Sequence, residues 1–145
     1  MNNELQKVTQ DELNQRISSG NKNFKNLDLS GLEFKISSGW GGTTGAILKN
    51  INFSNSNLTE ANFTECEIVN VNFTNAILTG AWFIQATCKN VNFSKTLLND
   101  VYFSNTQFID VVFDNVDVTG AWFRQACFEN SDLSKAKNLD RAVVI

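Results

Sequence analysis

Large apolar residues recur at every fifth position between Leu48 and Leu133, and this period limits what the chain can fold into. An α-helix does not fit, because a five-residue step turns about 140° past a full turn and spreads the apolar residues around the axis. A continuous strand does not fit either, because an odd period places successive apolar residues on opposite faces. The period therefore predicts short extended segments, each ended by a turn, that wind into a solenoid.

The apolar series has no break along this stretch. Its members are Leu48, Phe53, Leu58, Phe63, Ile68, Phe73, Leu78, Phe83, Cys88, Phe93, Leu98, Phe103, Phe108, Phe113, Val118, Phe123, Phe128 and Leu133. A small or β-branched residue stands two positions before most of them, as Ile51, Ala61 and Val71 do. Each short segment is therefore expected to place two residues inward, with the residue between them facing outward.

Residues twenty positions apart resemble one another more than residues five positions apart. One such set is aromatic, Phe63, Phe83, Phe103 and Phe123, and another is aliphatic, Leu58, Leu78, Leu98 and Val118. This spacing predicts four sides per coil, with like residues stacked on like. At a rise of roughly 4.8 Å per coil, the stretch from Leu48 to Leu133 would form a rod about 20 Å long.

Several five-residue units share a more specific pattern. They include Ala61-Asn62-Phe63-Thr64-Glu65, Val71-Asn72-Phe73-Thr74-Asn75, Val91-Asn92-Phe93-Ser94-Lys95 and Ser131-Asp132-Leu133-Ser134-Lys135. These motifs resemble the pentapeptide-repeat family, whose pattern is A-[N/D]-[L/F]-[S/T]-x. The resemblance covers most of the chain and implies a right-handed quadrilateral β-helix. It implies no particular activity, because most family members have no assigned one.

The all-β solenoid is expected at residues 21–138, between two short end segments. Residues 1–20 are predicted to form a helical cap, with a helix from Thr9 to Ser18, a capping-box pair of Thr9 and Glu12, and Gly20 at its end. A Gly-rich loop near 35–46 interrupts the repeat, because fourteen residues separate Phe34 from Leu48 where fifteen would keep phase. Residues 139–145 are expected to cover the last coil as a tail.

Composition excludes several classes of protein. The chain has 145 residues and a formal net charge of −3, and acidic residues outnumber basic ones between Asn50 and Ser134. A surface that binds nucleic acid directly is therefore not expected. No apolar run is long enough to span a membrane, and the N-terminus lacks the features of a signal peptide, so a cytoplasmic location is the expectation.

Catalysis and cofactor binding are not expected either. The chain has no histidine, and a convex rod filled by Phe side chains offers no concave site to its acids. The Gly-rich loop lacks the Gly-Lys-Ser/Thr ending of a phosphate-binding loop. Cys66 and Cys88 fall at inward positions and Cys127 at an outward one, without the paired spacing of a disulfide framework or a metal site.

Most outward positions are polar. Two sets of amides and acids are expected to stack from coil to coil and to exchange hydrogen bonds: Asn52, Asn72 and Asn92 on one wall, and Asn70, Asn90, Asp110 and Asn130 at one corner. Ile77 and Leu97 on one wall, and Trp82, Tyr102 and Trp122 on the next, are the exceptions.

The three outward aromatic residues are the main candidates for contact with a protein partner or a second copy of the chain, because exposed Trp and Tyr are enriched at interface hot spots. Trp40, in the Gly-rich loop, is a further candidate, because loops that protrude from a solenoid often carry binding contacts. The structural alternative is that Trp82, Tyr102 and Trp122 stack only to cover the wall and stabilise neighbouring coils.

The leading hypothesis is a non-catalytic protein-binding or scaffolding module. The family resemblance raises an alternative, since some members protect DNA gyrase from quinolones and look like duplex DNA in size and charge. DNA carries a charge about every 1.7 Å along its axis, whereas the acids here scatter over corners and walls of a short rod. The gyrase-binding members also dimerise through a C-terminal module, and no such module is expected here.

Overall fold

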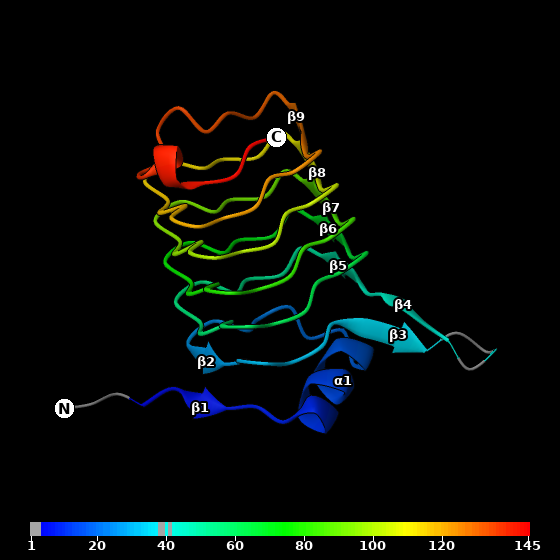
Figure 1. Ribbon diagram of the computed structural model, residues 1–145. Helices are drawn as coiled ribbons and strands as arrows, with labels where there is room; N and C mark the ends of the chain where they lie inside the picture. The colour runs from blue at the N-terminus through cyan, green and yellow to red at the C-terminus, as the bar shows by residue number, and fades with distance from the viewer. Residues whose placement is uncertain (1–3, 38–39, 41) are drawn as a thin grey trace.

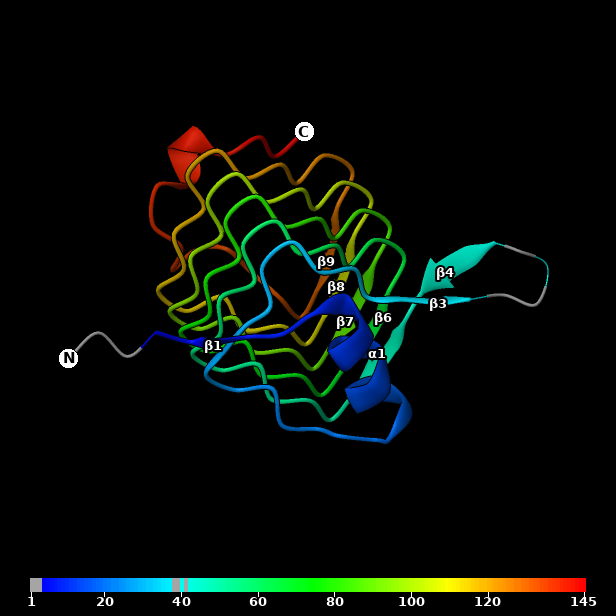
Figure 2. The ribbon, with the colours of Figure 1, turned by 90° about the horizontal axis from the view of Figure 1, so that it is seen from below.

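Four walls enclose the core of the molecule. The computed structural model describes residues 4–37, 40 and 42–145, and the chain winds through about six turns of a right-handed, four-sided β-helix (Figures 1 and 2). The elements are β1 (Gln6–Lys7), α1 (Gln10–Ser18), β2 (Leu27–Asp28), β3 (Lys35–Ser37), β4 (Thr43–Gly45), β5 (Ile47–Lys49), β6 (Glu67–Val69), β7 (Thr87–Lys89), β8 (Gln107–Ile109), β9 (Cys127–Glu129) and the 3-10 helix η1 (Leu139–Arg141). The predicted fold class is confirmed.

One wall is a regular parallel sheet. Strands β5 to β9 pair in order, and the register places Leu48 beside Ile68, then Cys88, Phe108 and Phe128. The other three walls are held by single parallel bridges, such as Asn52 with Asn72, and those within residues 52–137 have the same offset. The twenty-residue offset on every wall confirms the prediction of four sides per coil.

Stacked phenylalanine rings fill the interior. The rings of Phe53 and Phe73 lie 5.2 Å apart between centroids at an interplanar angle of 7°, and those of Phe73 and Phe93 lie 5.1 Å apart at 3°. A second column of rings meets the first edge-on, as Phe63 does with Phe73 at 86°. The predicted inward series is buried throughout, except that Phe128 is only partly buried in the last coil.

The corners explain why the period is five. The residue two positions after a core residue has a positive φ at most corners, for example 58° at Asn55 and 58° at Asn75. Asn and Asp tolerate this left-handed conformation better than other non-glycine residues, and Gly80 and Gly120 adopt it at the same position of their repeats. At three of the four corners a hydrogen bond closes the turn, such as the one from the Ser56 N–H to the Phe53 carbonyl at 3.2 Å.

The two predicted amide sets behave differently. At the corner, Asn70 donates to the Asn50 side chain at 3.1 Å and Asn90 donates to Asn70 at 2.7 Å, and this set does link neighbouring coils. On the wall, the Asn72 Oδ1 accepts instead from the N–H of Thr74, two residues later, at 2.9 Å. Asn52 and Asn92 make the same local contact, so the expected coil-to-coil bonding on that wall was wrong.

The Gly-rich interruption has regular pairing at its base. β3 and β4 form an antiparallel pair with Lys35 opposite Gly45, and this hairpin projects beyond the square outline of the coils (Figure 2). The Ala46 N–H donates to the Phe34 carbonyl at 3.0 Å, which is the usual corner bond, so the hairpin is an insertion at one corner. Leu48 is thus on the wall directly after that of Phe34, and the expected phase comparison of fourteen against fifteen residues was wrong.

The hairpin base requires glycine where it meets the next coil. A Cβ at Gly45 would overlap the backbone of Glu65 and Cys66, so only glycine permits this close approach. Ser38, Gly39 and Gly41, which belong to the Gly-rich loop expected near 35–46, lie outside the described residues.

Helix α1 lies across the N-terminal end of the coils (Figure 1). Thr9 and Glu12 form the predicted capping box, and the Leu13 side chain is fully buried in the core cluster. β1 pairs in parallel with β2, and the Gln10 amide both donates to the Glu33 carbonyl and accepts from the Glu33 N–H, each at 2.8 Å. The Gln10 side-chain amide therefore makes the hydrogen bonds that a neighbouring strand would otherwise make with the Glu33 backbone. No helix among the described residues has the length and apolar character needed to cross a membrane.

The C-terminal tail pairs with the last coil on two walls. Lys137 bridges Asp117, and Val143 bridges Trp122. The N–H of Phe123 donates to the Val143 carbonyl at 2.6 Å. Segment 137–143 therefore supplies backbone partners to the coil edge, with η1 between the two contacts.

The three cysteines are expected to differ sharply in reactivity. Cys66 and Cys88 are buried and Cys127 is exposed. Burial raises the pKa of Cys66 to about 12 and raises that of Cys88 as well, so neither forms a thiolate at neutral pH. A thiol reagent at pH 8 should label one thiol in the native protein and three in denaturant. The Cys127→Ser variant should show no rapid labelling, and rapid labelling of a second native thiol would contradict the burial.

Candidate partner-binding surface

The three predicted aromatic residues form one continuous strip. Trp82, Tyr102 and Trp122 bridge one another in order on neighbouring coils, and their side chains are 47%, 40% and 44% exposed. The rings of Trp82 and Tyr102 lie 6.1 Å apart between centroids, at an interplanar angle of 82°. We call these three residues the aromatic stripe.

The repeat itself makes these side chains face outward. Trp82 lies between Ala81 and Phe83, both fully buried, and Trp122 lies between the equally buried Ala121 and Phe123. Because successive side chains of an extended segment point to opposite faces, the middle residue must face solvent. The exposure of the stripe is therefore a consequence of core packing, and turning a Trp inward would displace two core residues.

Trp40 occupies a separate part of the surface. It lies between β3 and β4, outside the coils, and is 99% exposed. Grouping it with the stripe as a candidate contact residue stays a prediction.

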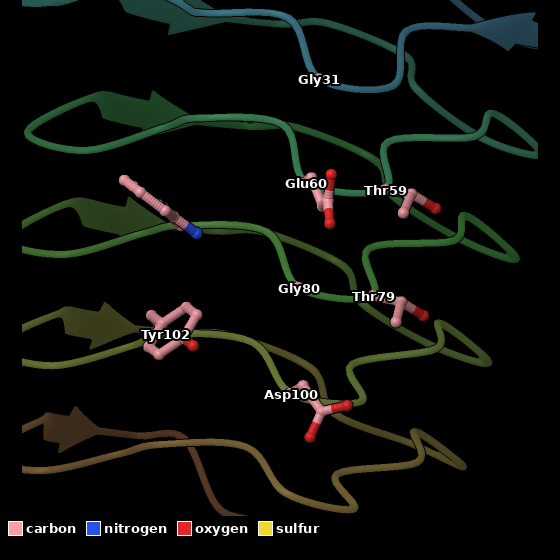
Figure 3. Close-up of a pocket in the computed structure, with 8 residues that line it drawn as sticks. Gly31, Thr59, Glu60, Thr79, Gly80, Asp100 and Tyr102 are labelled. Carbon is pink, nitrogen blue, oxygen red and sulfur yellow. The ribbon is translucent and has the colours of Figure 1, made fainter.

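A groove runs along the corner beside the stripe (Figure 3), and we call it the corner groove. It measures about 630 Å³ and is lined by Gly31, Thr59, Glu60, Thr79, Gly80, Trp82, Asp100 and Tyr102. The expectation that the rod offers no concave site was therefore wrong. Glu60, Gly80 and Asp100 occupy the same corner of three successive coils, and the missing side chain at Gly80 leaves the gap between the two acids.

The two carboxylates of the corner groove are exposed and have no hydrogen-bond or ion-pair partner among the described residues. The Asp100 side chain lies over Gly120 of the next coil, where a Cβ would overlap its carboxylate. The sequence carries the signal for this arrangement as an alternation of acid and glycine at twenty-residue spacing: Glu60, Gly80, Asp100, Gly120. None of the predictions from the sequence used this alternation.

Trp82 also borders a second groove, on the other side of its wall. This hairpin groove measures about 350 Å³ and lies between the hairpin residues Lys35 and Thr43–Gly45 and the coil residues Glu65 and Ile84. Trp82 is thus the residue that both grooves share.

Exposed aliphatic side chains lie on the opposite flank of the corner groove. Ile77 and Leu97 bridge each other on the wall that precedes this corner. The corner groove itself is lined by the Trp82 and Tyr102 rings and by carboxylates, and Ile77 and Leu97 lie outside its lining. Among the described residues, no three His, Cys, Asp or Glu side chains are grouped so that they could hold a metal ion.

A comparison with protein families identifies the repeat. The family model described as pentapeptide repeats (9 copies) matches residues 53–97 and 93–137, which together make up more than half of the chain. The chain belongs to the pentapeptide-repeat family. This pentapeptide-repeat protein has no match among curated proteins.

Solved structures of several proteins match the chain at low sequence identity. One from the Arabidopsis thaliana thylakoid lumen is 21% identical, with a TM-score of 0.43, over 82% of this chain and 67% of that one. One from Nostoc Pcc 7120 is 15% identical, with a TM-score of 0.42, over 90% and 93%. QnrB1, a plasmid-mediated fluoroquinolone resistance protein, is 19% identical, with a TM-score of 0.34, over 79% and 69%. Similarity at this level carries no argument about function.

Proposed function

We propose that this pentapeptide-repeat protein is a non-catalytic protein-binding module that docks a partner, or a second copy of itself, on the aromatic stripe. The observation that carries the proposal is the alignment of Trp82, Tyr102 and Trp122 on three successive coils, each between 40% and 47% exposed. Aligned exposed aromatics form a contiguous apolar surface, and such surfaces mark interaction sites more often than single exposed residues do.

The wall beneath the stripe is suited to binding without rearrangement. Both backbone groups of each stripe residue are bonded to the preceding coil, as when the Tyr102 N–H donates to the Ala81 carbonyl at 3.0 Å and the Tyr102 carbonyl accepts from the Phe83 N–H at 2.8 Å. A surface that is already ordered loses little conformational entropy when a partner docks. Trp and Tyr also bring large contact areas with only two side-chain torsions to fix.

The non-catalytic part of the proposal rests on how open the acids are. Glu60 and Asp100 line the corner groove but are exposed to solvent. General acid–base catalysis depends on carboxyl groups whose surroundings shift their pKa toward the working pH, and burial is a principal way to do this. Carboxylates in open water are better suited to attract a cation.

Replacing Trp82 and Trp122 with serine tests the binding role. The double variant should stay folded and lose about 1 kcal/mol or less of stability, because it removes the one ring contact of Trp82 and leaves the core intact. Self-association by light scattering, or partner capture from a lysate of the source cells, should be abolished. The matched control is Ile77→Ser with Leu97→Ser, which removes two exposed apolar side chains from the neighbouring wall. A stripe variant that melts much earlier but associates normally would show that the stripe only stabilises the coils.

The DNA-mimic alternative has less support from the charges. Two acids of the coils are paired with lysines, Glu67 with Lys49 at 3.3 Å and Asp114 with Lys135 at 3.5 Å, which breaks the run of negative charge that a mimic of duplex DNA needs. Gyrase that supercoils DNA normally in the presence of the protein, with and without a quinolone, is the result we expect. Inhibition or protection at stoichiometric concentration would favour the alternative.

A further inference from the structure

The corner groove combines three features that together recognise a particular chemical group. We propose that it receives the guanidinium group of an arginine side chain, presented by the protein partner that docks on the aromatic stripe. This inference rests on the proposed binding function and adds to it the chemistry of one contact.

The first feature is unbalanced negative charge. Glu60 and Asp100 line one groove, and neither has an ion pair or a hydrogen bond within the part of the chain that the structure describes. Arg141 is the next cation along this corner, since its carbonyl accepts a hydrogen bond from the Gly120 N–H at 3.0 Å, but it is not among the residues that line the groove. A cation from outside would therefore complement the groove, whose lining among the described residues includes no lysine or arginine.

The second feature is the aromatic wall. Trp82 and Tyr102 line the groove together with the carboxylates, and their rings differ in orientation by 82°. A cation over the face of Trp or Tyr is attracted by the negative potential of the ring face. A planar guanidinium can stack on such a ring and direct its N–H groups to a carboxylate at its edge, whereas the compact ammonium of lysine is more strongly hydrated and does not stack in this way.

The third feature is the space between the acids. Glu60 and Asp100 are two coils apart, which is about 10 Å at the spacing of paired strands. Gly80 occupies the corner between them and has no side chain of its own, and the Glu60 Cγ lies 3.4 Å from where a Cβ at Gly80 would be (Figure 3). A side chain that enters here passes between two carboxylates and reaches the Trp82 and Tyr102 rings. Charge, stacking surface and space thus occur at one site.

NMR titration of the full chain with short peptides tests the inference. The probe is the blocked peptide Gly-Ser-Arg-Ser-Gly, compared with peptides that carry lysine or the neutral isostere citrulline in place of arginine. The arginine peptide should shift the indole N–H of Trp82 in a saturable way at low salt, and the shift should be lost at high salt. The citrulline peptide should bind at least about fivefold more weakly, because it loses both charge contacts. The lysine peptide should also bind more weakly, because it loses the stacking contact.

A variant pair then assigns the effect to the groove. The double variant Glu60→Gln with Asp100→Asn keeps the shape of both side chains. It should weaken binding of the arginine peptide by at least about fivefold. Glu129→Gln, which removes an exposed carboxylate from β9, should change nothing. Equal binding of the three peptides, or unchanged binding by the groove variant, would overturn the inference. If the protein captures its partner equally well with and without the groove carboxylates, only the arginine contact is overturned. The proposed function of the aromatic stripe then stays in place.

Discussion

Replacing Phe73 with alanine is expected to lower the free energy of unfolding by about 3–5 kcal/mol. The Phe73 ring is fully buried, with Phe53 and Phe93 stacked at 5.2 Å and 5.1 Å and Phe63 and Phe83 edge-on at 5.7 Å and 6.0 Å. Its removal leaves a cavity that the coils cannot close, because the backbone hydrogen bonds fix the distance between neighbouring walls. The cost therefore includes both the lost burial and the unfilled space.

Chemical denaturation measures this loss, and the adjacent residue supplies the control. Asn72 faces outward, and its Oδ1 accepts two local hydrogen bonds, from the Thr74 N–H at 2.9 Å and from the Thr74 hydroxyl at 2.5 Å. Asn72→Ala should therefore cost about 1 kcal/mol at most. Similar losses in the two variants would contradict the assignment of inward and outward positions on which the whole fold depends.

The period alone was enough to predict the core. A five-residue repeat with buried residues at its first and third positions leaves one geometry that keeps both inside, so Phe53, Phe73 and Phe93 could be placed in one column from the sequence. Residues twenty positions apart resemble one another because stacked side chains must match in size. This resemblance was enough to predict the number of walls. These inferences succeeded because every repeat imposes the same local constraint.

The hairpin could not be predicted from the period. Its position depends on antiparallel pairing of β3 with β4 and on the contact of Gly45 with the backbone of Glu65. Neither is encoded in the repeat, and counting residues from Phe34 to Leu48 gives no information on how much of the segment leaves the coils. β1 was missed for a related reason, because a strand of two residues carries no periodic signal.

The candidate site was predicted only in part. The stripe follows from the outward position before each core phenylalanine, which the sequence shows directly. The corner groove depends on the alternation of Glu60, Gly80 and Asp100 along one corner, whereas the stacking prediction covered only the corner of Asn70, Asn90, Asp110 and Asn130. Reading each of the five repeat positions at twenty-residue spacing would have found the two acids and the glycine between them.

Removing residues 1–20 is expected to convert the protein into oligomers whose size rises with concentration. The deletion takes Val8 and Leu13 out of the core cluster that also contains Phe24 and Phe34. It also leaves β2 without β1, and the backbone of Glu33 without the Gln10 amide. An apolar coil end with unpaired backbone groups is a template for pairing with another chain. Light scattering over a range of protein concentrations measures the effect.

Two comparisons separate edge pairing from simple unfolding. Far-UV circular dichroism should show that the truncated chain keeps its β structure, because the coils beyond Phe53 retain their stacked rings and wall hydrogen bonds. Gln10→Ala in the full chain opens only the Glu33 edge and leaves Leu13 in place, so it should stay monomeric or associate far more weakly. A truncated chain that is monomeric at every concentration would show that α1 and β1 do not protect this end. Oligomers that lack the β signal would show that residues 1–20 are needed to keep the coils folded. Association would then come from unfolded chains and not from pairing at the exposed coil edge.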